Sequence, residues 1–166
     1  MRKVVNSLER IINKTNEIVG LIASALIVFL MILTFTNVAG RYFIRPVLGT
    51  HELTYLSLAL IVFLSLGYIQ SHKEHIAIGV FIDKLSVRTQ AVIDSITYLV
   101  IFVLLLLMAW QMVVFGGRTS TTTTGDLYLP VYYFVYISAV GVLLYALTAA
   151  VDFLKSLLKV VSKDES

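Results

Sequence analysis

Hydrophobic residues gather in four long runs along this chain, and polar residues gather between the runs. The runs predict helices near residues 18–39, 53–69, 94–115 and 127–151. Each is close to the roughly 20 residues that a helix needs to cross a hydrocarbon core of about 30 Å. We therefore predict an all-α integral membrane protein, a single domain over residues 1–166 with four transmembrane helices.

None of the four runs carries a lysine, arginine or carboxylate near its middle. Ionisable groups are costly inside a bilayer and usually mark proton relays or ion paths. Their absence from the middle of the runs argues against a self-sufficient pump or antiporter. The pattern favours a scaffold, an anchor or a partner subunit.

A different pattern precedes the first run. Apolar positions recur there at helical spacing, and basic and acidic residues occupy the other positions; the apolar set includes Val4, Leu8, Ile11 and Ile18. This predicts a short N-terminal amphipathic helix that lies in the headgroup region before the first span. A solvated basic leader is the alternative.

The distribution of basic residues predicts the orientation. Ten of the thirteen Lys and Arg residues precede the first run, lie between the second and third, or follow the fourth. The other three, on the opposite side, are Arg41, Arg45 and Arg118. The positive-inside bias therefore places both termini and the middle connection in the cytoplasm.

Composition narrows the function classes. Hydrophobic residues make up 58% of the chain and charged residues 14%, against about 25% charged in soluble domains. This leaves no room for a soluble catalytic domain, and no pattern of catalytic residues occurs, so we do not expect an enzyme. Basic residues in short connections suit anionic membrane lipids better than nucleic acid. The absence of cysteine excludes disulfides and thiol chemistry.

Local signals predict where the helices begin and end. Thr50 is a plausible cap for the second span, and Ser86 could begin a helix that continues through Asp94 to Gly116. At 1.5 Å per residue, such a helix is longer than the hydrocarbon core is thick, so it must tilt or protrude. Pro130 fits the first turn of the fourth span.

A short connection after the first span brings three polar candidates together. Asn37 and Arg41 lie one helical turn apart, Pro46 and Gly49 favour a tight hairpin, and Glu52 begins the second span. Arg41 and Glu52 could pair at the outer rim. Alternatively, Arg41 snorkels towards water and Glu52 independently complements its helix dipole.

Small and amide side chains inside the spans are candidates for helix packing. Gly20, Ser24, Gly67 and Gly141 allow helices to approach closely, within the chain or against a larger partner. Gln111 is expected to make a hydrogen-bonding contact between helices. Tyrosines cluster at the start of the fourth span, where they form either an interfacial belt or a docking surface for another protein; they are Tyr128, Tyr132, Tyr133 and Tyr136.

The middle connection contains His72, Glu74 and His75 in an H-x-E-H pattern. No third protein ligand is apparent, so a structural or interfacial role for His75 is preferred over a metal site.

Several short motifs, in this order, are similar to one transporter family. The stretch from Asn37 to Phe43, the pairs Glu52-Leu53 and Leu66-Gly67, the stretch from His75 to Ile78, and Leu129-Pro130 after a threonine-rich segment resemble the small membrane (Q-type) subunit of tripartite ATP-independent periplasmic (TRAP) transporters.

The resemblance implies a three-part system in the bacterial inner membrane. A periplasmic solute-binding protein would capture an organic acid, such as a dicarboxylate or a sialic acid, and a large multispan permease subunit would move it with a sodium gradient. The small subunit would act as a scaffold for the large one and hold no cofactor or metal of its own. A self-sufficient, homo-oligomeric four-span transporter or channel remains the alternative.

Overall fold

The structure, a computed structural model, describes residues 2–43, 45–72 and 87–161. In this part of the chain there are four long helices: α1 (Arg2–Phe43), α2 (Thr50–Ser71), α4 (Val87–Arg118) and α5 (Val131–Val161). Each is long and apolar enough to cross a membrane. The prediction of an all-α protein with four membrane-spanning helices is confirmed.

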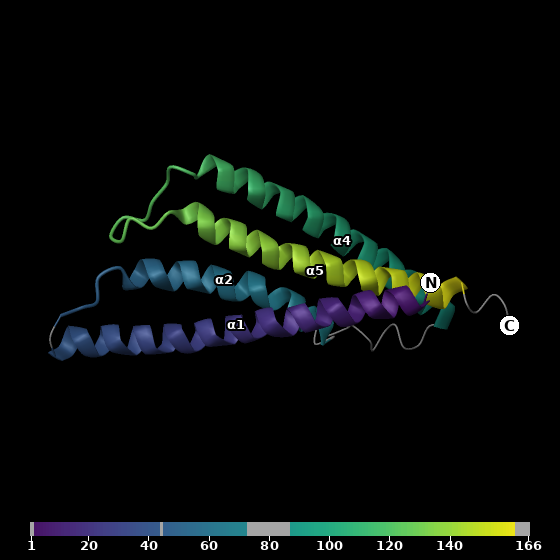
Figure 1. The fold of residues 1–166 in the computed structure, drawn as a ribbon, viewed down its shortest axis with the longest axis horizontal. Coiled ribbons are helices and arrows are strands. Elements are labelled where there is room, and N and C mark those ends of the chain that lie inside the picture. Colours follow the sequence, from purple (N-terminus) through teal and green to yellow (C-terminus); the bar gives the residue numbers. More distant parts are fainter. Residues whose placement is uncertain (1, 44, 73–86, 162–166) are drawn as a thin grey trace.

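The helices lie side by side in the order α1, α2, α5, α4 (Figure 1). The links from α1 to α2 and from α4 to α5 lie at one end of the molecule, which we call the hairpin end. The start of α1 and the end of α5 lie together at the other, the termini end. Helix α5 is central because α1, α2 and α4 all pack on it.

Three helices are longer than a hydrocarbon core requires. The 42 residues of α1 would extend about 63 Å, the 32 residues of α4 about 48 Å and the 31 residues of α5 about 47 Å. The segment predicted as a separate interfacial helix is instead the first part of α1, which continues without a break into the span. Part of its polar face contacts α5, so the bundle holds it against the other helices.

Two apolar clusters form the core. One joins α4 to α5 through Leu105, Ala109 and the buried face of α5 around Val142 and Ala146. The other joins α1 to α2 through Ala23, Leu60 and Leu64. Alanines supply four of the eight buried residues of these clusters, and such small side chains let helices approach closely in a membrane.

The starts of the second and fourth spans differ in the structure from those predicted from the sequence. Gly49, with φ 73°, precedes α2. Thr50 is already helical, and its hydroxyl donates a hydrogen bond to the carbonyl of Val47 at 2.7 Å rather than capping the helix. The fourth helix begins at Val131, four residues later than predicted, because the preceding residues fold back as far as Pro130, which pairs with Thr123 in an antiparallel bridge.

Candidate functional site

The carboxylate of Glu52 joins the two links at the hairpin end. It is buried in the first turn of α2. Its two oxygens accept hydrogen bonds from the backbone amides of Asp126 at 2.6 Å and Leu127 at 2.9 Å. The ionised form of a carboxylate suits two N–H donors because both of its oxygens accept. We call this contact the outer latch.

The threonine-rich link presents those two amides by folding on itself. The backbone amide of Thr124 donates to the carbonyl of Leu129 at 3.0 Å, and the hydroxyl of Thr124 accepts from the amide of Leu129 at 2.9 Å. Between them, Tyr128 adopts a positive φ of 55° and is 75% exposed. The bonded residues on either side therefore hold this tyrosine outside the fold.

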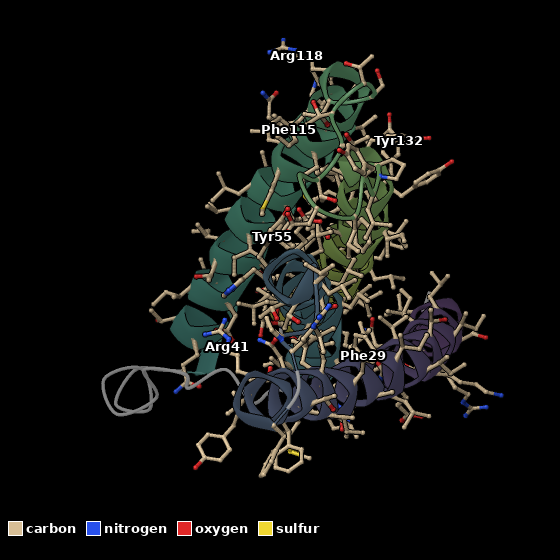
Figure 2. The ribbon with its side chains drawn as sticks, turned by 90° about the vertical axis from the view of Figure 1, so that its left-hand side faces the viewer. Phe29, Arg41, Tyr55, Phe115, Arg118 and Tyr132 are labelled. Atoms are coloured by element: carbon tan, nitrogen blue, oxygen red, sulfur yellow. The ribbon has the colours of Figure 1, made fainter. Side chains whose placement is uncertain are left out.

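The two other candidates near the hairpin have separate positions. Asn37 is buried, and its side-chain oxygen accepts a hydrogen bond from the amide of Val47 at 3.0 Å, which fixes the link to α1. Arg41 is exposed (Figure 2). Among the described residues, no ion pair joins Arg41 to Glu52. The pairing considered for Arg41 and Glu52 is therefore absent, because backbone amides occupy the carboxylate instead.

Three of the four small residues proposed for packing lie at contacts inside the chain. A Cβ on Gly20 would stand 2.6 Å from the ring of Tyr68, and a Cβ on Gly67 would stand 2.6 Å from the side-chain oxygen of Asn16. At Gly141 it would stand 2.8 Å from the carbonyl carbon of Phe63. These glycines let α2 approach α1 and α5, so they are unavailable to a partner.

Ser24, the fourth small residue, is exposed and donates its hydroxyl to the carbonyl of Gly20 at 3.0 Å on its own helix. It is therefore placed where another protein or lipid could reach it. His75 and Glu74 lie outside the described residues, as does Ser86. His72 follows the last residue of α2, and the centre of its ring lies 4.2 Å from the centre of the Tyr68 ring.

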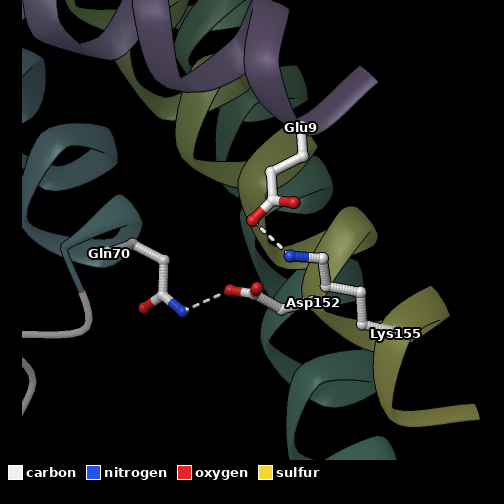
Figure 3. A network of polar contacts seen from close by, with 4 residues as sticks. All are labelled: Glu9, Gln70, Asp152 and Lys155. Carbon is white, nitrogen blue, oxygen red and sulfur yellow. Dashed lines mark hydrogen bonds and ion pairs between the residues drawn. The ribbon is translucent and has the colours of Figure 1, made fainter. Parts of the chain in front are cut away.

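A set of polar contacts holds the helices together towards the termini end (Figure 3). Glu9 of α1 pairs with Lys155 of α5, and the amide of Gln70 of α2 donates to the carboxylate of Asp152 at 2.9 Å. Nearby, the amide of Asn16 donates to the hydroxyl of Thr148 at 2.9 Å. We call these six residues the inner clasp; they fasten α1 and α2 to α5.

A groove opens between α2, α4 and α5 towards the hairpin end. Its volume is about 470 Å³ and its lining is almost wholly apolar. Tyr55 and Phe63 line it from α2, and Met108 and Phe115 from α4. Gln111 also faces the groove and, among the described residues, has no hydrogen-bond partner. The hydrogen-bonding helix contact predicted for Gln111 is therefore not made within the described part of this chain.

Residues 30–159 match the DctQ component of tripartite ATP-independent periplasmic transporters. The chain belongs to this family. The comparisons with curated proteins and with solved structures gave no match. In the part of the chain that the structure describes, this TRAP small permease component has four helices long and apolar enough to cross a membrane. Within the matched residues lie the whole outer latch, the groove, and the parts of the inner clasp on α2 and α5.

The flanks of this DctQ component are largely apolar and open. In the apolar 18-residue stretch that would cross the membrane, 11% of α1 and 17% of α4 are buried, against 44% of α5. Figure 2, which looks onto the hairpin end, shows side chains standing out from these outer helices, among them Phe29 of α1 and Phe115 of α4. In a membrane this surface faces lipid or a partner.

Sequence reasoning missed the inner clasp, although a signal was present. Thr148, Asp152 and Lys155 follow one another by four and three residues on α5, so they share one helix face. Asn16 marks the matching face of α1. A polar stripe on an otherwise apolar helix predicts contacts between helices in a membrane.

Proposed function

We propose that this DctQ component braces the large permease subunit of its transporter during sodium-coupled uptake of an organic acid that a periplasmic binding protein delivers. The proposal places the chain in the bacterial inner membrane with both termini in the cytoplasm. The hairpin end would then face the periplasm, and the ten-to-three distribution of basic residues supports this orientation.

One observation carries the proposal. Three carboxylates of the described helices are engaged in contacts that hold the bundle together: Glu52 in the outer latch, and Glu9 and Asp152 in the inner clasp. All three lie towards helix ends, where they brace the bundle instead of forming a path across it. A chain built in this way suits a scaffold, and the driving ion would bind in the large subunit.

The test is reconstitution of uptake from defined parts. Liposomes would hold the large subunit with or without this chain, a sodium gradient would be imposed, and the binding protein would be added outside with a labelled carboxylated solute. We expect uptake only when both membrane subunits, the binding protein and sodium are present.

Two results would contradict the proposal. Sodium-driven uptake by this chain alone would make it a transporter in its own right, as the homo-oligomer alternative requires. Equal uptake by the large subunit with and without this chain would remove the bracing role. A chain in which Glu52→Ala breaks the outer latch is a useful third sample, because it separates bracing from mere presence.

A further inference from the structure

The groove between α2, α4 and α5 exists because two of its walls do not close on each other. Helices α2 and α4 each pack on α5, but they share no extensive contact with one another. The wall from α4 is a single stripe at helical spacing, formed by Met108, Gln111, Met112 and Phe115. Methionines adapt their shape to what lies against them.

Two small residues line the base of the groove between larger neighbours: Ser138 of α5 and Ala59 of α2. Small residues at the base of a groove let another backbone come close, which is the usual condition for helices to associate in a membrane. The shape of the groove therefore suits an elongated apolar object that lies along α5.

The side chain of Gln111 indicates whether a lipid or a protein helix occupies the groove. It is seven residues from the end of α4 at Arg118, or about 10 Å along the helix axis, within a stretch that is otherwise apolar. Its amide has no hydrogen-bond partner among the described residues. An amide in hydrocarbon without a hydrogen bond is costly. Acyl chains carry no group that could satisfy it, whereas a protein helix with a polar side chain can.

We propose that the groove receives a transmembrane helix of the large permease subunit, and that Gln111 forms a hydrogen bond with a polar side chain of that helix. This rests on the function proposed above, which requires a large membrane partner. The inserted helix packs over Ala59 and Ser138 and against the methionines of α4. It also closes the gap that the chain leaves between α2 and α4.

The test uses the complete transporter with a tag on the large subunit. Gln111→Leu removes the hydrogen bond at nearly constant size, and Val113→Leu is the control, because Val113 is exposed on α4 but does not line the groove. We expect Gln111→Leu to insert normally, to keep its melting temperature in detergent, and to lower its recovery with the large subunit about three- to tenfold. Recovery of Val113→Leu should equal that of wild type.

A photo-crosslinker identifies the occupant directly. The photoreactive amino acid p-benzoylphenylalanine would replace Met108 in the groove or, as a control, Leu106, which is 42% exposed and does not line the groove. We expect an adduct with the large subunit from position 108 and little from position 106. An adduct only with phospholipid, an adduct with a second copy of this chain, or equal yields from both positions would overturn the proposal.

The two proposals fail in different ways. If the wild-type chain does not co-purify with the large subunit at all, the bracing function is wrong. If the two co-purify, but Gln111→Leu is recovered as well as wild type and position 108 gives no adduct with the large subunit, then the bracing function stands and the groove assignment is wrong.

Discussion

Replacing Gly141 by alanine tests a close contact between α2 and α5. The new Cβ would stand 2.8 Å from the carbonyl carbon of Phe63 and 3.1 Å from the Cα of Leu64. Unbonded carbons rest at about 3.5–4.0 Å, so α2 and α5 would have to separate by up to about 1 Å. The neighbouring atoms are backbone, so no side chain can rotate away to make room.

The expected cost is about 1–3 kcal/mol, the usual range for overpacking. Alanine is also a better helix former than glycine by up to about 1 kcal/mol, which works in the opposite direction. Gly117→Ala supplies the control, because its Cβ would have only the Tyr136 hydroxyl nearby, at 4.0 Å. We therefore expect Gly141→Ala to be less stable than Gly117→Ala, and also less stable than wild type unless the helix gain offsets the cost.

The measurement is unfolding of the purified chain by titration with SDS in mixed micelles, followed by circular dichroism. The comparison between the two alanine variants isolates the contact from the helix-forming preference. If both variants unfold at the same SDS fraction, α2 and α5 do not meet at Gly141 as described, and the argument for intrachain packing of this glycine fails.

Three further predictions follow from the two ends of the bundle. Glu52→Gln should speed hydrogen exchange at the two link amides that bond to Glu52 by about tenfold or more, because a glutamine has one acceptor oxygen for two donors. The control His51→Gln, in the same turn, should leave this exchange rate unchanged. An unchanged rate in Glu52→Gln would show that the outer latch does not exist. Asn16→Leu and Thr148→Val should show a coupling of about 0.6 kcal/mol in a double-mutant cycle, the typical value for such bonds in membranes, and strict additivity would contradict the contact. A reporter enzyme that works only in the periplasm should be inactive when it is fused at Ser166. Activity of this fusion would show that the proposed orientation, with both termini in the cytoplasm, is wrong.

The four helices were predictable because length and apolarity alone decide whether a segment can cross a membrane. The small residues were predictable for a similar reason, since close approach requires a missing side chain: Gly20, Gly67 and Gly141 all lie at such contacts. Which helix each one meets was not predictable, because this depends on how the helices are arranged around α5.

The outer latch could not be predicted from the pattern of residues in the sequence. Glu52 bonds to the main chain of a link 74 residues away, and backbone amides leave no mark in the sequence. An arginine nearby in sequence therefore drew attention to the wrong partner. The continuous α1 escaped prediction because an amphipathic pattern fits a membrane surface and a protein surface equally well, and only the presence of α5 decides between them.

Helix α5, which follows the other described helices in the sequence, is the one on which they all pack. Synthesis proceeds from the N-terminus at about 5–20 residues per second, so α1, α2 and α4 are made before α5. Until α5 arrives, α4 lacks the helix it packs on, and Asn16 and Gln70 lack the side chains that they bond in the finished subunit. Unbonded amides are costly in a membrane. A chain whose synthesis stops before α5 therefore exposes polar side chains that are bonded and buried once α5 is present. These exposed amides distinguish an unfinished subunit chemically from a finished one.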